Sequence, residues 1–293
     1  MMSTSPGAAG TKLVVRLPNA IGDLLMTLPG LELLDSSGFD CRLVARPFAH
    51  QLLAGTAYDL SSIRSKASER RAFRTSGARW GLTFRSSFSS AWQMRRAGLR
   101  PMGFDGQGRR LVLARTFPRP RGRLKVEENY RLAEGIVSFL DRPERANSAT
   151  PQGPAPTKGE PSAVPLIILR TTDEQRGQAR RRLQAAGVRG GFIVANPVAD
   201  LAKGAGFRVW PHFKAFTSRL RDRGLNVVTC PGPGEEELCR ELAPESTHLH
   251  DVSIGDRIGD DETPAHTRCL ESSSGLPALL VGGPQNDQGN GRG

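Results

Sequence analysis

Two kinds of apolar spacing alternate along the first half of the chain and predict strands followed by helices. Residues 12–17 form a short Val- and Leu-rich run, which is typical of a strand buried on both faces. Residues 24–34 then repeat leucine at spacings of three and four, which predicts a helix. The same patterns predict further strands at residues 41–46 and 81–85, and further helices at residues 48–54, 86–98 and 126–140.

A second α/β segment follows a stretch rich in Pro, Ala, Gly and Ser that has no periodicity and is therefore expected to be a linker. Two alternating segments joined by a linker predict two Rossmann-like, doubly wound domains that face a cleft. The expected domains are residues 1–141 and 164–252, with the linker at residues 142–163. In the second domain, strands are expected at residues 166–170, 191–196 and 225–230, and helices at residues 173–187, 211–223 and 235–243.

Residues 253–275 are polar and aperiodic, and after residue 243 little of the chain remains to complete the second sheet. We expect the tail, residues 253–293, to be poorly ordered, apart from a short apolar strand at residues 276–281. The C-terminal domain is accordingly expected to be incomplete, and limited proteolysis is expected to cut first after Arg257 or Arg268.

The charge balance favours an anionic partner. The chain has 41 Lys and Arg residues against 29 Asp and Glu residues, a formal net charge of +12. Only 6% of the residues are aromatic, and no recognition-helix module is visible, so nucleic acid is a weaker alternative. No apolar run is long enough to cross a bilayer and the N-terminus lacks the pattern of a signal peptide, so we expect a cytoplasmic protein.

Cysteine and histidine spacing gives no sign of a metal site. The four cysteines form no CxxC pair, and in a cytoplasmic chain they are expected to be reduced packing residues. His248, His250 and Asp251 lie close together but lack a further ligand cluster nearby, so we interpret them as surface or strand-edge residues and expect no metal.

The most informative local feature is the turn between the first strand and the first helix. Gly22 is expected at the corner of this turn and Asp23 at the start of the helix. In α/β proteins, ligands bind at the carboxyl ends of parallel strands, where helix N-termini present free N–H groups. Taken alone, the residues favour a simpler role, in which Asp23 caps the helix. The absence of GxGxxG after this strand gives no support to a dinucleotide site.

Four stretches in sequence order resemble the heptosyltransferase family, the bacterial enzymes that add ADP-activated heptose to the lipopolysaccharide inner core: residues 14–34, 84–113, 125–135 and 191–243. The resemblance implies the GT-B arrangement of an N-terminal acceptor domain and a C-terminal nucleotide-sugar domain. It also implies an anionic lipopolysaccharide core as acceptor, with ADP-heptose as a substrate and no separate cofactor. Peripheral contact with the cytoplasmic face of the inner membrane is a further expectation, and nucleic acid is not expected as a partner.

The resemblance also assigns roles to individual residues. Sugar transfer from a nucleotide diphosphate needs a base for the acceptor hydroxyl and positive charge for the leaving diphosphate. Asp23 matches the family's proposed base, and Gly22 belongs to the same loop. Arg208 matches the basic position before Trp-Pro that meets the diphosphate, although it could simply face solvent. Ser86 and Ser87 lie in the loop that approaches the acceptor, where serine is also an ordinary helix cap.

Glu235 falls where family members bind the ribose hydroxyls of the donor. Glu236 and Glu237 are near-equivalent choices for this role. An acidic residue is also favourable at a helix N-terminus without any ligand, so this alternative stays open.

The C-terminal part departs from the family. The family's late signature is an Asp, a Ser or Thr, a Gly, and a His three residues later, whereas the nearest stretch here, residues 269–285, lacks the Asp and the His. A divergent, truncated or frameshifted C-terminus would explain this, and it puts the activity of this chain in doubt. Two alternatives to an active transferase therefore stay open: a catalytically impaired relative that acts as a binding module, and a basic nucleic-acid-associated protein.

Overall fold

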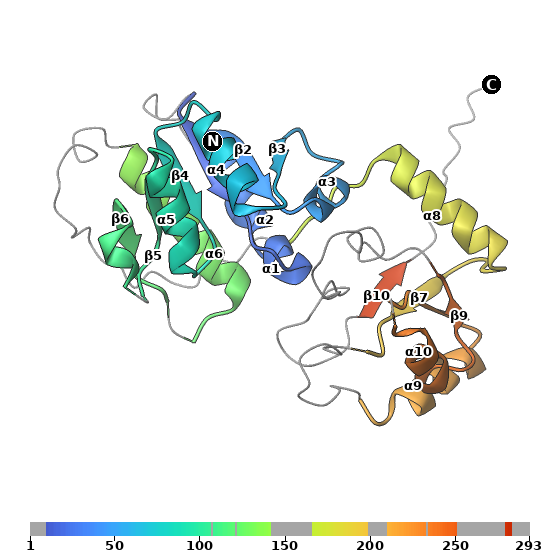
Figure 1. The fold of residues 1–293 in the computed structure, drawn as a ribbon. Coiled ribbons are helices and arrows are strands. Elements are labelled where there is room, and N and C mark those ends of the chain that lie inside the picture. The colour runs from blue at the N-terminus through green and yellow to red at the C-terminus, as the bar shows by residue number, and fades with distance from the viewer. Residues whose placement is uncertain are drawn as a thin grey trace, which may run out of the picture. The chain divides into compact units, whose positions relative to one another are not determined.

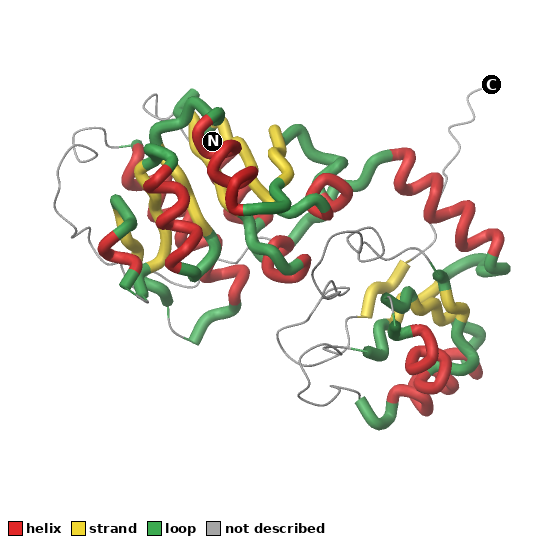
Figure 2. The backbone as a smooth tube through the Cα atoms, in the orientation of Figure 1, coloured by secondary structure: helices red, strands yellow, loops and turns green. Residues whose placement is uncertain are grey.

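The computed structural model describes residues 10–106, 108–120, 122–141, 166–198, 210–232, 234–250 and 279–282. It divides into two compact units, Met1–Thr171 and Thr172–Gly293, which are described separately. Figure 1 gives the order of their elements, and Figure 2 distinguishes the helices, strands and loops.

The first unit is built on a parallel sheet of six strands in the order β3-β2-β1-β4-β5-β6. The central strand β1 is apolar because both of its faces are covered, and Leu13, Val14 and Val15 have no exposed surface. The order of the strands reverses between β1 and β4, which makes these two neighbours the topological switch point. The strands are β1 Lys12–Arg16, β2 Asp40–Ala45, β3 Asp59–Ser62, β4 Trp80–Thr83, β5 Arg100–Phe104 and β6 Arg115–Phe117.

Helices cover both faces of this sheet. On one face, α4 and α5 bury Phe73 and Met94 against Val14 and Val44. On the other face, α2 packs along α6, and a side chain at Gly30 would crowd the backbone of α6. The helices of this unit are α1 Ile21–Leu25, α2 Leu28–Ser36, α3 Phe48–Leu52, α4 Lys66–Arg74, α5 Phe88–Arg96, α6 Lys125–Leu140 and the 3₁₀ turn η1 Arg109–Leu111.

The helix expected at residues 24–34 is interrupted. The chain forms α1 and α2 with a break at Met26 and Thr27 between them. Pro29 accounts for the break, because proline has no N–H to donate to the carbonyl four residues earlier and is favoured in the first turn of a new helix. The Thr27 hydroxyl donates to the Leu24 carbonyl at 2.6 Å and so holds the break together.

The second unit contains a smaller sheet in the order β10-β7-β8-β9. Its β7, β8 and β9 strands run parallel, whereas β10 pairs antiparallel with β7. Its core is formed by Ala195, Phe213, Val227 and Ala243. The elements are α8 Asp173–Ala185, β7 Phe192–Ala195, α9 Phe213–Asp222, β8 Asn226–Thr229, α10 Glu236–Leu242, β9 Thr247–His248 and β10 Leu279–Gly282.

Residues 166–170 are not the strand that the hydrophobic pattern predicted. They are extended coil in the first unit, where Arg170 pairs with Glu32 of α2 at 3.4 Å. A side chain at Gly55 would overlap the Arg170 carbonyl, so the coil and the loop after α3 are in close contact. The apolar run was misleading because Leu166 and Ile168 remain 82% and 53% exposed instead of entering a sheet.

Of the remaining expectations about helices and strands, some are confirmed and some elements were missed. The pattern missed β3, β5, β6 and α4, whereas part of the apolar strand expected at residues 276–281 is observed as β10. The linker, the rest of the tail and the expected domain boundaries lie outside the described residues, so these stay predictions.

Candidate functional site

The segments that lead to Asp23 and to the Ser86–Ser87 pair leave neighbouring strands at the topological switch point. β1 pairs in parallel with β4, and Arg16 at the end of β1 lies opposite Thr83 at the end of β4. The pairing extends one step further, because the Phe84 N–H donates to the Arg16 carbonyl at 3.4 Å. The β1–α1 and β4–α5 loops therefore start side by side at the edge of the sheet where α/β proteins bind ligands.

A buried arginine organises the β1–α1 loop. The Arg16 side chain is 2% exposed, and its Nε lies 2.5 Å from Oε1 of Glu69, which reaches it from α4. Arg16 Nη1 donates to the Leu17 carbonyl, and Nη2 donates to Oδ1 of Asn19 at 2.8 Å. Burial lowers the pKa of Arg16 to about 10, and Glu69 opposes this shift. At neutral pH the guanidinium is charged and holds both the loop and α4.

Asp23 lies in the first turn of α1, two residues after the helix begins, and its side chain is exposed. The N-cap of α1 is Ala20, so Asp23 does not occupy the capping position that the residues alone favoured. Among the residues that the structure describes, no hydrogen bond or ion pair is made by the Asp23 carboxylate. This carboxylate is therefore accessible to a substrate hydroxyl, as a general base must be.

Gly22 does not lie at the corner of the turn, contrary to the expectation. It is the second residue of α1, and its carbonyl accepts the Met26 N–H at 3.1 Å. The change of direction instead falls at residues 18–20, where Pro18 follows the end of β1 and Arg16 holds Asn19.

The Ser86–Ser87 pair lies between β4 and α5. Ser87 is the N-cap residue of α5, but its hydroxyl bonds to the Ser90 hydroxyl at 3.2 Å instead of a backbone N–H. Ser86 is exposed, and within the described ranges its hydroxyl has no hydrogen-bond partner. Both serines therefore lie in the segment that leaves β4 at the switch point, and their contact with an acceptor stays a prediction.

Arg85, which precedes this pair, is a candidate that the sequence patterns did not single out. Burial lowers its pKa, and Arg46, the residue after β2, lowers it further, whereas Glu69 opposes the shift. Among the described residues, its guanidinium makes no hydrogen bond or ion pair. A half-buried guanidinium without such a partner suits an anionic ligand at the switch point.

Glu235 is the N-cap residue of α10, one position before the helix, and not one turn inside it as expected. Its Oε2 accepts the Gly232 N–H at 3.0 Å, which closes the turn before the helix. Burial raises its pKa, and the Gly232 hydrogen bond opposes this shift. The half-buried carboxylate therefore has a structural partner, and its proposed contact with ribose hydroxyls would use the remaining oxygen.

Glu235→Gln is expected to weaken ADP binding by about fivefold, because a neutral acceptor binds a hydroxyl less strongly than a carboxylate does. Stability at neutral pH is not expected to fall, because the amide oxygen can still accept the Gly232 N–H. Because the pKa of Glu235 is raised in the folded protein, ionisation of this carboxyl lowers the stability of the parent as the pH rises through that pKa. The Gln side chain does not ionise, so the variant does not lose stability in this way. Calorimetric titration with ADP and thermal unfolding test both points; unchanged ADP affinity would contradict the ribose contact.

Arg208 lies outside the described residues, so its contact with the diphosphate stays a prediction from the sequence. Arg208→Ala is expected to weaken binding of an ADP-sugar by about 1.5–3 kcal/mol, the scale of a charge-assisted hydrogen bond. Acceptor binding should be unchanged. Arg223→Ala is a matched control, because Arg223 is an exposed arginine at the end of α9 in the same unit. Equal ADP-sugar affinity in Arg208→Ala and the parent protein would remove Arg208 from the site.

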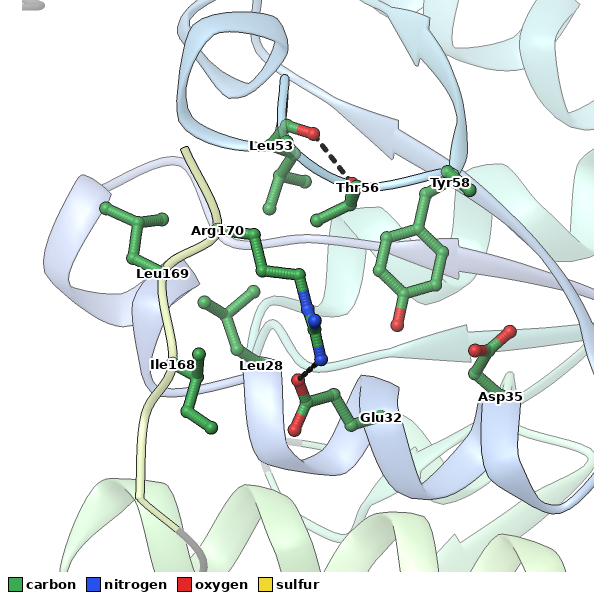
Figure 3. A pocket seen from close by; sticks show the side chains of 11 residues that line it. Leu28, Glu32, Asp35, Leu53, Thr56, Tyr58, Ile168, Leu169 and Arg170 are labelled. Atoms are coloured by element: carbon green, nitrogen blue, oxygen red, sulfur yellow. Dashed lines mark hydrogen bonds and ion pairs between the residues drawn. The ribbon is translucent and has the colours of Figure 1, made fainter. Parts of the chain in front are cut away.

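A pocket of about 350 Å³ lies in the first unit beside α2, as Figure 3 shows. Arg170 reaches into it and pairs with Glu32, and Asp35 and Tyr58 line another side. Burial raises the pKa of Tyr58, and the neighbouring Asp35 carboxylate adds to the shift. Two carboxylates and one guanidinium that is already paired do not suit a diphosphate. We therefore place the candidate site at the switch point and not in this pocket.

The described part of the chain holds no group of three or more His, Cys, Asp or Glu side chains arranged for a metal ion. His248 lies in the edge strand β9, as expected, and its Nδ1 lies 2.6 Å from the Thr229 hydroxyl. Within the described residues, no helix is long and apolar enough to span a membrane.

Comparisons with known proteins identify relatives in structure. No family model matches the sequence, and no curated protein matches it. The ADP-heptose lipopolysaccharide heptosyltransferase II of E. coli is 18% identical, with a TM-score of 0.58, over 79% of this chain and 68% of that chain. A glycosyl transferase family 9 protein of Veillonella parvula is 13% identical, with a TM-score of 0.63, over 82% of this chain and 69% of that chain.

A third structure is the E. coli heptosyltransferase WaaC with ADP-2-deoxy-2-fluoro heptose. It is 17% identical, with a TM-score of 0.53, over 82% of this chain and 76% of that chain. These matches cover both α/β units and confirm at the level of the fold the resemblance that four sequence stretches indicated. The chain has the α/β fold of the heptosyltransferases, the GT-B glycosyltransferase fold.

Proposed function

We propose that the protein is a glycosyltransferase that moves a heptose from ADP-heptose to a hydroxyl of the lipopolysaccharide inner core. The observation that carries the proposal is the exposed carboxylate of Asp23, which has no hydrogen-bond or ion-pair partner among the described residues. Asp23 follows β1, whose neighbour β4 leads to the Ser86–Ser87 pair at the switch point of the sheet. Two related structures contain ADP or an ADP-heptose analogue, which supports a nucleotide sugar as the donor class. The reaction would take place at the cytoplasmic face of the inner membrane.

In the proposed reaction, Asp23 accepts the proton of the acceptor hydroxyl. As that proton leaves, the hydroxyl oxygen attacks the anomeric carbon of the heptose. The bond from this carbon to the diphosphate breaks, and ADP leaves with the bonding electrons. Proton, sugar and leaving group are thus all accounted for without a cofactor.

Positive charge at the switch point would bind the acceptor. The inner core of lipopolysaccharide is anionic, and Arg85 lies one residue before Ser86 with no hydrogen-bond or ion-pair partner among the described residues. The guanidinium would bind a carboxylate or phosphate of the acceptor and orient its hydroxyl toward Asp23. Arg208 and Glu235 would hold the diphosphate and the ribose of the donor.

The alternative function is a catalytically impaired relative that binds a ligand without turnover. The sequence feature that favours it is the missing late Asp-Ser/Thr-Gly-x-x-His stretch, because in the family this loop lies under the donor diphosphate. Such a protein would keep the acceptor half of the site and lose transition-state stabilisation of the leaving group.

Binding and turnover measured separately distinguish these functions. We expect calorimetry to detect ADP binding, with UDP bound more weakly, and a transfer assay with purified inner-core acceptor to detect heptose addition. Binding of ADP or acceptor without transfer would favour the impaired relative. Absence of both, with steep salt-dependent binding to RNA, would overturn the proposal in favour of a nucleic-acid-associated protein.

A further inference from the structure

The exposed side of α4 and α5 combines positive charge with aromatic surface. Residues 64–104 contain ten Lys and Arg residues and only one acidic residue, Glu69. Glu69 is buried and paired with Arg16, so it does not offset the surface charge. The exposed cations on α4, on α5 and in the loops beside them are Arg64, Lys66, Arg71, Arg74, Arg79, Arg95 and Arg96.

Helix α5 presents two aromatic rings to solvent on this side. Phe88 and Trp92 are 39% and 44% exposed, although aromatic side chains of this size are normally well buried. The rings lie nearly parallel, with centroids 6.3 Å apart and 21° between their planes. Burial in the core does not explain them, because α5 packs against the unit through other residues, Ser90, Ala91 and Met94.

Two arginines extend the row of exposed side chains that Phe88 and Trp92 form on α5, and this row is called the aromatic stripe. Arg95 and Arg96 follow Trp92 by three and four residues, a spacing that places side chains on one face of a helix. The stripe also has an apolar neighbour. Val112 and Leu113 pack on Ala91 of α5, and the preceding Leu111 is 83% exposed. One face of α5 thus has aromatic surface at its N-terminal end and guanidinium groups at its C-terminal end.

We propose that this face of α5 docks on an anionic lipid surface. Trp and Phe partition favourably at the boundary between headgroups and acyl chains, and nearby Lys and Arg are attracted to anionic headgroups. The excess of positive charge over residues 64–104 provides the matching electrostatic attraction. RNA fits less well, because single-stranded nucleic acid is bound in basic grooves with aromatic faces free for stacking. Here the two rings stack on each other.

Co-sedimentation of the full chain with vesicles tests the proposal and does not depend on transferase activity. We expect binding to vesicles of equal parts phosphatidylcholine and phosphatidylglycerol, weak binding to phosphatidylcholine alone, and release at high salt. Phe88→Ser combined with Trp92→Ser should lower the affinity about tenfold. Arg95→Gln combined with Arg96→Gln should lower it by about tenfold to thirtyfold.

Matched controls in the second unit separate this face from general basic charge. Arg219→Gln combined with Arg223→Gln removes the same two charges from exposed positions of α9 and its C-cap. Leu225→Ser removes an apolar side chain that is 39% exposed. Each should change the vesicle affinity by less than about twofold. A loss as large as that of the α5 variants would show diffuse attraction and overturn the assignment.

Fluorescence provides a second measurement on the parent protein. Trp92 emission, obtained by subtracting the spectrum of Trp92→Phe, is expected to shift to shorter wavelength with anionic vesicles and to be quenched by brominated lipid. Circular dichroism and thermal unfolding of all variants confirm that the fold is kept. Absence of vesicle binding by the parent chain, or tighter binding to an RNA oligonucleotide through the same α5 residues, would overturn the proposal.

Discussion

Asp23→Asn is expected to lower the rate of sugar transfer by about two to four orders of magnitude, because the amide cannot accept the acceptor proton. Asp23 is exposed and lies outside the N-cap position, so the substitution removes no capping bond. The loss of its charge near the start of α1 should cost less than about 1 kcal/mol of unfolding free energy. Initial rates with saturating donor and acceptor, together with thermal unfolding, measure the two effects.

Asp35→Asn is a suitable control, because it removes one carboxylate near the end of α2, in the pocket that we do not assign to the reaction. Its transfer rate is expected to stay within about threefold of the parent. An Asp23→Asn protein with the parent's turnover would remove Asp23 from the mechanism. ADP binding by that variant would leave the donor half of the proposal intact.

Glu69→Ala is expected to lower the unfolding free energy by about 3–5 kcal/mol, because it leaves Arg16 buried without its counter-charge. Arg16 also binds the Leu17 carbonyl and Asn19, so the β1–α1 loop should lose part of its support. Denaturant unfolding measures the cost, and native-state hydrogen exchange of residues 17–24 measures the loosening of the loop.

The Arg42–Asp59 pair provides the matched control for Glu69. Nε of Arg42 lies 2.7 Å from Oδ2 of Asp59, and the two side chains are 34% and 60% exposed. Asp59→Ala should therefore lower the unfolding free energy by less than about 1 kcal/mol. Replacing Arg16 and Glu69 together by methionine should recover most of the stability, because no unpaired charge is then buried. A cost for Glu69→Ala no larger than that for Asp59→Ala would contradict the structural role of the buried pair.

Local sequence patterns were sufficient to predict an element where burial was strong on both of its faces. The strands at residues 12–17, 41–46 and 225–230 and the helix at residues 126–140 were predicted within a few residues of β1, β2, β8 and α6. The patterns missed β3 and β6, which are short edge strands with partly exposed residues. They also missed β5, because Pro101 is unusual in an interior strand.

The sequence by itself determined the class of the fold and one half of the candidate site. Strand-like and helical spacings, the strand-to-helix turn before Asp23 and the excess of basic residues are local properties, so they can be read without a structure. The family resemblance added roles for Asp23, Ser86, Ser87 and Glu235, which stay predictions.

Only the tertiary structure decided which of these residues lie on neighbouring elements. The pairing of β1 with β4 joins segments about 70 residues apart, and no local pattern specifies such a pairing. The same holds for the Arg16–Glu69 pair, which spans 53 residues and is set by the packing of α4 on the sheet. The exposure of Trp92 is also a tertiary property, because whether a helix face is covered depends on the neighbours that the fold brings to it.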